Sequence, residues 1–475
     1  MRFLISFILL IFLWIPLFQT LTGIINIESI HEHSKSLLSN NMGFSWSRLR
    51  DGSWQKAVEA NLIQRIGFRP ILIRFSNQLR LSFFPNSPSK HYIFTSSLGF
   101  VPLDTVRRLN GDLRNRAAIE REYAHASERF AALSSSLSNL NIPLVAVLAP
   151  PKARVYPEAL EDKYLLTDAS KLLSSAASFS RELESQGVAV LDFQDIFRQW
   201  KSTINQPLYA STGFHWNYYA ACLASQVLID RVSNISSKPF MQIDCSDVEM
   251  EISRWADNDI LWALNTLSFS SYVKKAPFPR PKKVDSITSF RKFPRFLFVG
   301  DSYANMLIYN FVAAFGPKSV IYYEYMKNRF VYQDDYRPDM VHYSTLVSAK
   351  SLAEDLLNID AVVLVISDGN LPRSSAVSGD FGLFDLLSLP TVVQPDTKEM
   401  KIELILGNWK YQGKSASIAA TDLTDVVVCT NELNASVEAK IESGQLLWAM
   451  DWDIYAVLSG DGKELRWSNG SIWTR

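Results

Sequence analysis

One serine stands where a buried strand is expected to give way to a helix. Gly-Asp-Ser-Tyr at 300–303 follows the apolar run 296–299 and precedes a helical pattern over 303–315. Such a position exposes the hydroxyl of Ser302 and surrounds it with backbone N–H groups that can stabilise an anionic oxygen. Asp-Ser before a helix is also ordinary capping chemistry, so this motif alone does not identify an enzyme.

A nucleophilic serine needs a base, and the chain has six histidines. His215 lies in the run 209–221, directly before an amphipathic helix, where a base can face a cleft. A solitary histidine beside aromatic residues is usually structural, so the two motifs gain weight only together. The other histidines have charged, polar or membrane-proximal surroundings: His31, His33, His91, His125 and His342.

The motifs occur in a fixed order along the chain. The segment 150–158 (Pro-Pro-Lys-Ala-Arg-Val-Tyr-Pro-Glu) comes first, the histidine segment 209–221 second and the serine motif 300–303 third. In this order they resemble the AlgX/AlgJ family of alginate O-acetyltransferases, in which the histidine motif precedes the serine motif in a permuted SGNH hydrolase fold. The likeness covers roughly residues 45–390.

This resemblance implies a periplasmic enzyme that moves acetyl groups onto an exported polysaccharide. Ser302 would carry the acyl group, and His215 would deprotonate first the serine and then the acceptor hydroxyl. The backbone N–H groups of Ser302 and Tyr303 would be the oxyanion donors. A membrane-bound O-acyltransferase would supply the acyl group, and no cofactor is implied.

The sequence departs from the family pattern at one position. The family has Asp-x-His-Trp, in which the aspartate orients the imidazole, whereas this chain has Gly213 there. Loss of such an acid can lower the rate by orders of magnitude. Three explanations stay open: a backbone carbonyl holds His215, an acid such as Asp368 or Glu324 substitutes, or the chain is a non-catalytic relative.

Four further residues are candidates for contact with substrate. Lys152 and Arg154 follow the strand expected at 142–148 and could bind an anionic sugar, although a solvated loop fits equally well. Trp216 and Asn217 more simply shape the histidine loop. A deacetylating esterase and a glycan-binding scaffold remain alternatives to the transferase.

The elements that must position these residues alternate between apolar strands and amphipathic helices. Strands are predicted at 142–148, 188–192, 296–299, 320–323 and 361–366, with helices at 114–139, 168–186, 216–232, 303–315 and 346–357. Continuous apolar strands of this kind indicate an α/β fold, here an SGNH hydrolase-like parallel sheet with helices on both faces. Ligands bind at the carboxyl ends of such strands.

We expect four regions along the 475 residues. Residues 1–25 form an N-terminal transmembrane anchor, because the stretch 3–25 is apolar and Arg2 precedes it; a cleaved signal peptide is the rival interpretation. Residues 26–110 form a helical entry segment, and 111–390 form the α/β domain. The globular part would then lie outside the cytoplasm, bound to the inner membrane.

Residues 391–475 are expected to form a small all-β domain. Strands are predicted at 401–406, 426–430 and 437–442, and a hairpin at 464–475 turns at Asn469-Gly470. Its tryptophans suit either carbohydrate binding or core packing: Trp409, Trp448, Trp452, Trp467 and Trp473.

Composition limits the other classes of function. Lys plus Arg and Asp plus Glu both total 48, so nucleic acid is not an expected partner. Cys222, Cys245 and Cys429 are too few and too scattered for a disulfide framework, and because none falls in a Cys-x-x-Cys pair, metal binding through cysteine is not expected. A single Cys222–Cys245 bridge is possible in an oxidising compartment.

Overall fold

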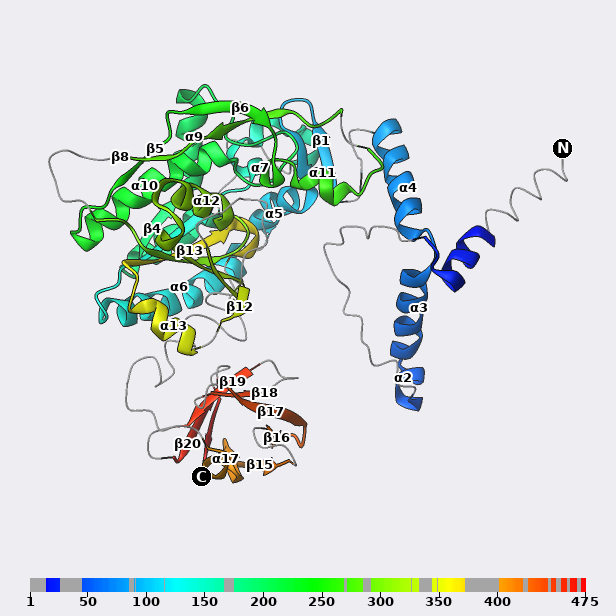
Figure 1. Cartoon of the computed structure of the whole chain (residues 1–475), viewed down its shortest axis with the longest axis vertical. Helices are drawn as coiled ribbons and strands as arrows, with labels where there is room; N and C mark the ends of the chain where they lie inside the picture. The colour runs from blue at the N-terminus through cyan, green and yellow to red at the C-terminus, as the bar shows by residue number, and fades with distance from the viewer. Residues whose placement is uncertain are drawn as a thin grey trace. The chain divides into compact units, whose positions relative to one another are not determined.

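The computed structural model describes residues 14–25, 45–84, 89, 91–114, 116–165, 175–268, 271–284, 292–325, 327–332, 344–347, 349–371, 401–421, 426–442, 446–449, 454–458, 462–467 and 471–475. The chain divides into two compact units (Figure 1). The first comprises Met1–Asp104, Ala210–Phe214 and Ile252–Lys275, and the second comprises Thr105–Tyr209, His215–Glu251 and Ala276–Arg475.

Helices dominate the N-terminal part of the first unit. They are α2 (Trp46–Arg50), α3 (Ser53–Arg65) and α4 (Arg69–Phe83), followed by the short antiparallel pair β1 (Tyr92–Thr95) and β2 (Gly99–Pro102). This hairpin was not predicted, because four-residue strands separated by a short turn leave too little alternation to recognise. α11 (Asp259–Leu264) completes the unit's small core with Leu81, Tyr92 and Phe100.

The predicted membrane anchor is only partly within the described residues. Residues 14–22 are helical, and residues 3–13 lie outside the described part. Among the helices that are described, none combines the length and the apolar character needed to cross a bilayer.

The second unit contains a seven-stranded sheet in the order β12-β11-β10-β9-β13-β3-β4. The strands are β3 (Leu144–Ala149), β4 (Ala189–Asp192), β9 (Phe296–Gly300), β10 (Val320–Glu324), β11 (Asn328–Val331), β12 (Ser344–Leu346) and β13 (Ala361–Ser367). From β10 to β4 neighbouring strands are parallel. The α/β prediction is thereby confirmed for the centre of the sheet.

The prediction of an all-parallel sheet was wrong at one edge. β11 pairs antiparallel with β10, and β12 pairs antiparallel with β11. β11 begins four residues after β10 ends, and a parallel crossover needs a dozen or more residues. The short connection therefore dictates a hairpin, and the sheet is mixed.

Helices pack on both faces of this sheet. On one face α6 (Arg116–Ser138), α8 (Ser175–Ser185) and α13 (Ala349–Leu356) form a core with the alternate strand residues Leu144, Ala146 and Leu148. On the other face Phe311 of α12 (Ala304–Phe315) lies with its ring centroid 5.3 Å from those of both Phe296 and Phe298. Strands buried on both faces explain the unbroken apolar runs in the sequence.

The second unit also contains α5 (Leu103–Arg114), α7 (Lys152–Val155), α9 (Phe193–Thr203), α10 (Tyr218–Ser236), β5 (Gln242–Asp244), β6 (Val248–Ile252), β7 (Lys275–Pro279) and β8 (Lys282–Val284), with 3-10 turns η1 (Pro157–Ala159), η2 (Asp162–Tyr164), η5 (Pro317–Ser319) and η6 (Asp368–Asn370). The 3-10 turn η4 (Trp255–Asp257) belongs to the first unit. Residues 152–155, which were predicted as loop, form the single turn α7.

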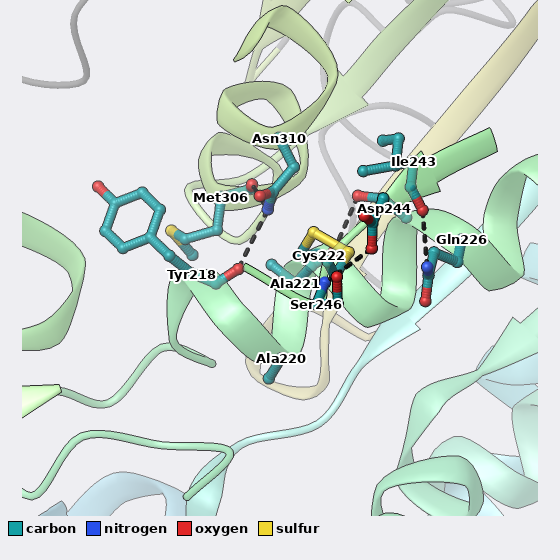
Figure 2. The surroundings of a disulfide bond; sticks show 12 residues. Tyr218, Ala220, Ala221, Cys222, Gln226, Ile243, Asp244, Ser246, Met306 and Asn310 are labelled. Carbon is teal, nitrogen blue, oxygen red and sulfur yellow. Dashed lines mark hydrogen bonds between the residues drawn. A yellow bond between two sulfur atoms is a disulfide. The ribbon is translucent and has the colours of Figure 1, made fainter. Parts of the chain in front are cut away.

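One disulfide joins Cys222 of α10 to Cys245, immediately after β5 (Figure 2). Asn310 of α12 donates to the Tyr218 carbonyl at 3.1 Å and to the Met306 carbonyl at 2.7 Å. The first turn of α10 is thus held both by a covalent bridge and by a buried amide from α12.

The C-terminal residues form a closed antiparallel barrel in the order β14 to β21. After the short helix α17 (Ile402–Ile405) come β14 (Gly407–Tyr411), β15 (Lys414–Ala420), β16 (Val426–Thr430), β17 (Ser436–Glu442), β18 (Leu446–Ala449), β19 (Ile454–Leu458), β20 (Glu464–Trp467) and β21 (Ile472–Thr474). The all-β prediction is confirmed, but the strand predicted at 401–406 is a helical turn. Asn469-Gly470, the predicted turn between the paired strands β20 and β21, and the predicted boundary at 390 lie outside the described residues.

The tryptophans of the barrel include three that serve its interior. Trp409, Trp467 and Trp473 are at most 3% exposed and lie in one apolar core. They do not form a surface on which a sugar could stack. Trp452 lies outside the described residues, and the exposure of Trp448 is not described.

Candidate active site

The predicted nucleophile and base lie within hydrogen-bond distance of each other. His215 Nε2 is 2.8 Å from Ser302 Oγ. His215 is 2% exposed, whereas Ser302 is partly exposed in the turn between β9 and α12. This separation is within the range over which a histidine can take the proton of a serine hydroxyl.

Gly300 lets the serine turn form at the end of β9. A Cβ atom at this position would lie 2.1 Å from the carbonyl oxygen of Val365 on the neighbouring strand β13. No real contact is that short, so β9 and β13 can approach this closely only because residue 300 has no side chain. The following residues are thereby brought beside the end of β13.

Asp301 connects three segments around the serine through hydrogen bonds. Its Oδ2 accepts from the backbone N–H of Ser367 at 2.8 Å and from Asn370 Nδ2 at 2.7 Å, both at the end of β13. Its backbone carbonyl accepts from the Tyr322 hydroxyl of β10 at 2.9 Å. Asp301 therefore fixes where the serine turn lies on the sheet.

One of the two predicted oxyanion donors is already engaged. The backbone N–H of Tyr303 donates to Asp301 Oδ1 at 3.1 Å in a buried setting. This hydrogen bond does not fit the predicted role, because the same N–H would have to point at the reacting oxygen. The aspartate beside the nucleophile competes for that N–H, which a reading of the motif alone could not reveal.

Trp216 and Asn217 shape the histidine loop, as the simpler interpretation had it. Trp216 is fully buried, and its Nε1 donates to the Tyr303 carbonyl at 3.0 Å. Asn217 caps α10 by accepting from the Ala220 N–H at 2.8 Å. The His215 ring also lies 4.5 Å, centroid to centroid, from the ring of Tyr303. These contacts connect the histidine segment directly to the serine turn.

Lys152 and Arg154 are buried, so the predicted solvated loop was wrong. They are 1% and 2% exposed. Arg154 Nε lies 2.9 Å from Asp368 Oδ1, and the two side chains are 2% and 3% exposed. Because β3 and β13 are adjacent and parallel, with Ala149 opposite Ser367, the residues that follow them meet at one edge of the sheet. Arg154 takes part in this buried ion pair, and contact of Lys152 or Arg154 with a substrate stays a prediction.

The acid that would serve His215 stays a prediction. The Asp368 carboxylate pairs with Arg154, and burial raises the pKa of Glu324 at the end of β10, against a lowering hydrogen bond from Asn328. Asp192, the N-cap of α9, has a pKa raised to about 6, chiefly by burial.

Gly213 stands in place of the family aspartate, and neighbouring backbone of the first unit leaves no room for a side chain at this position. A Cβ atom there would lie 2.5 Å from the Ala256 carbonyl oxygen and 3.0 Å from the backbone carbon of Asp257. Thr212 Oγ1 donates to the Asp257 carbonyl at 2.6 Å, and the Phe214 N–H donates to Asp259 Oδ1 at 3.0 Å. Backbone of the segment 256–257 thus occupies the space that a side chain at 213 would need.

Tyr325 is a site residue that the sequence did not reveal. It follows β10 directly, its N–H donates to the Gly300 carbonyl at 2.9 Å, and its φ is 49°, which is rare for an aromatic residue. Burial and the charge of Asp301 raise the pKa of its phenol, while hydrogen bonding to the side chain and backbone of Ser302 lowers it. Such left-handed residues concentrate at functional sites, but only a structure shows the φ value.

Over the described ranges, no group of three or more His, Cys, Asp or Glu side chains is arranged to hold a metal ion.

Part of the chain matches a known protein family. Residues 110–316 match the family model described as "SGNH hydrolase-like domain, acetyltransferase AlgX". The resemblance predicted from the motifs is confirmed over this range, which contains both His215 and Ser302. No curated protein sequence matches the chain.

Solved structures also match the chain, at low sequence identity and with TM-scores below 0.5. They include the O-acetyltransferase domain of Pseudomonas putida AlgJ, at 16% identity over 59% of this chain and 92% of that one, with a TM-score of 0.37. Pseudomonas aeruginosa AlgX matches at 11% identity over 74% and 80% of the two chains, with a TM-score of 0.40. Bacillus cereus PatB1 matches at 15% identity over 53% and 91%, with a TM-score of 0.34.

Proposed function

Because residues 110–316 form an SGNH hydrolase-like domain of the type in the acetyltransferase AlgX, we propose that this protein is an O-acyltransferase acting on an exported polysaccharide. The observation that supports this most directly is the 2.8 Å separation of His215 Nε2 and Ser302 Oγ inside the matched range. A serine and a histidine at that distance suit two-step acyl transfer.

In the first step Ser302 Oγ attacks the carbonyl carbon of an acyl donor while His215 Nε2 takes the hydroxyl proton. The tetrahedral intermediate collapses, the donor's leaving group receives that proton, and the acyl group stays on the serine as an ester. In the second step a sugar hydroxyl attacks this ester and gives its proton to His215. The imidazole then returns the proton to Ser302 Oγ, and the acylated sugar leaves.

The negative charge of each intermediate develops on the former carbonyl oxygen. The Tyr303 N–H is engaged by Asp301, and the Ser302 N–H is hydrogen-bonded to the phenol oxygen of Tyr325, so the hydroxyl of Tyr325 is the donor that can turn toward the reacting oxygen. A tyrosine hydroxyl can serve as an oxyanion donor, and Tyr325 is 42% exposed, so a bound acyl donor can reach it. We assign this role to Tyr325.

The acyl group, the partner and the location belong to the same proposal. An acetyl group delivered by a membrane-bound O-acyltransferase follows from the family type. A site outside the cytoplasm, anchored to the inner membrane through residues 3–25, is supported by the apolar N-terminal sequence and by the Cys222–Cys245 disulfide, since such bridges persist in oxidising compartments.

The test is turnover of a chromogenic acetyl ester by the purified chain, with mass spectrometry of the intact protein for an acetyl adduct. Ser302→Ala and His215→Ala should abolish turnover, and only the serine change should remove the adduct site. Ser185→Ala and His91→Ala alter exposed residues of the same two types and should behave as wild type.

Adding an oligosaccharide acceptor separates the possible outcomes. Formation of acetylated sugar supports the transferase, whereas turnover to free acetate that no acceptor diverts would make the protein an esterase. A wild-type chain that neither turns over nor forms an adduct would refute both, and the protein would then be a glycan-binding scaffold.

A further inference from the structure

Helix α4 is attached to the first unit through one face. Asn77 Nδ2 donates to the Leu264 carbonyl at 2.8 Å and to the Asn265 carbonyl at 3.3 Å, and Leu81 is 1% exposed in the core of this unit. Gln78 Oε1 accepts from the Ser268 N–H at 3.0 Å. The side of α4 that carries Asn77 and Leu81 is therefore its buried side.

The opposite side of α4 is apolar and exposed. Its side chains are between 39% and 72% exposed: Ile71, Leu72, Phe75, Leu79 and Phe83. At 100° per residue, these five positions fall within an arc of about 120° centred roughly opposite Asn77 and Leu81. We call them the α4 stripe. A continuous apolar stripe on a soluble surface is uncommon and marks a surface that meets an apolar partner.

Charge distinguishes the partners that could cover this stripe. Arg69, Arg74 and Arg80 lie on α4 at the two flanks of the stripe, and the helix contains no Asp or Glu. Over residues 45–84 there are seven Lys or Arg but only two Asp or Glu, in a chain whose totals are equal. An apolar stripe flanked by arginines is typical of a helix that lies in the headgroup region of an anionic bilayer.

The start of α4 contacts the apolar N-terminal segment. The Gly67 N–H donates to Thr20 Oγ1 at 2.7 Å. Phe68, the N-cap of α4, lines an apolar hollow of about 420 Å³ together with residues of 14–25. Leu21 and Ile24 in that segment are 77% and 71% exposed. The segment 14–25, whose sequence already favours lipid, therefore lies beside the start of α4 within the first unit (Figure 1).

From these observations we propose that α4 lies in the interface of a bilayer containing anionic lipids, with the α4 stripe in the acyl-chain boundary and its arginines at the phosphate groups. The segment 14–25 and α4 then form two successive membrane contacts. This docking is independent of the acyl-transfer chemistry.

The experiment places an environment-sensitive dye at single cysteines of the full chain, at Leu79→Cys and Phe75→Cys. Glu438→Cys, at an exposed position of strand β17, is the control, and buried Cys429 leaves little native background. In vesicles of phosphatidylcholine and phosphatidylglycerol, the dyes at 75 and 79 should brighten and shift to the blue. Lipids carrying a quencher on the acyl chain should then quench them, and the dye at 438 should not respond.

The contribution of the arginines is tested by replacing them and by changing the charge of the vesicles. Replacing Arg69, Arg74 and Arg80 with Gln should lower the quenchable fraction of the dye at 79, about five-fold in partitioning for each arginine at an anionic surface. Vesicles of phosphatidylcholine alone should show no such dependence. A dye at 79 that stays in water in both kinds of vesicle would overturn the proposal and leave a protein partner as the occupant of the stripe.

Discussion

Restoring the family aspartate at position 213 should damage this protein rather than improve it. The Gly213→Asp substitution adds a Cβ atom 2.5 Å from the Ala256 carbonyl oxygen and 3.0 Å from backbone of Asp257, where no flexible side chain can move aside. Overpacking of this kind costs about 1–3 kcal/mol, and a carboxylate buried without a matched partner adds about as much again. We expect the free energy of unfolding to fall by about 3 kcal/mol or more.

Gly213→Ala is the control that separates steric from electrostatic effects, because it introduces the same Cβ atom without the charge. It should account for about 1–3 kcal/mol of the loss. Urea unfolding, monitored by tryptophan fluorescence, measures the free energy of unfolding of both variants. Turnover of an acetyl ester measures the activity of the site. Turnover should decrease as well, because a shift of residue 213 is transmitted through Phe214 to His215.

A particular result would refute this reasoning. If Gly213→Asp is as stable as wild type and its turnover rises, the structure has room for an acidic side chain at position 213. The close approach of the segment 256–257 would then not be the reason for the glycine.

Three further predictions concern the second unit. Tyr325→Phe should lower kcat on an acetyl ester by about 10²-fold, as expected for loss of one oxyanion donor, without altering the thermal midpoint; an unchanged kcat would exclude that role. Asp192 has a pKa raised to about 6 on folding from 3.8, so the folded state holds its proton more tightly and stability is lost as pH rises from about 4 to 6. Asp192→Asn keeps the α9 cap, so its free energy of unfolding should exceed that of wild type by up to about 3 kcal/mol at pH 8 and should equal it near pH 3. An equal difference at both pH values would contradict the raised pKa of Asp192. Replacing Cys222 and Cys245 together with Ser should lower the free energy of unfolding by about 3 kcal/mol, from a loop of 23 residues, and reductant should have no further effect on that variant.

Local pattern was enough to predict most of the second unit. The strands at 144–149, 296–300 and 361–367 were recognisable because burial on both faces makes a strand apolar throughout. The pairing of Ser302 with His215 came from the family resemblance, and the two side chains lie 2.8 Å apart. The strands are specified by neighbouring residues, whereas the pair is not.

What the sequence could not give depends on contacts between distant segments. The burial of Lys152 and Arg154 follows from the meeting of β3 and β13, and a charged turn after a strand looks like an exposed loop until that meeting is known. The engagement of the Tyr303 N–H depends on which way the Asp301 side chain turns. The φ value of Tyr325 has no counterpart in residue type, since tyrosine rarely adopts it.

The α17 helix shows that a short alternation of polar and apolar residues is not enough to predict a strand. Lys-Ile-Glu-Leu-Ile-Leu at 401–406 alternates polar and apolar residues for its first four positions, yet residues 402–405 form one helical turn. Ile405 is fully buried, and its carbonyl accepts from Trp409 Nε1 at 2.8 Å. The need to close the barrel interior at that end outweighs a short preference for strand.

The disulfide of Figure 2 also links the rigidity of the segment that carries His215 to oxidation of two thiols. Cys222 lies seven residues after His215, within the first two turns of α10. In a reducing compartment both thiols would stay free, and α10 would lack its covalent link to the segment after β5. Oxidation would then act as a separate assembly step that stiffens the segment carrying His215.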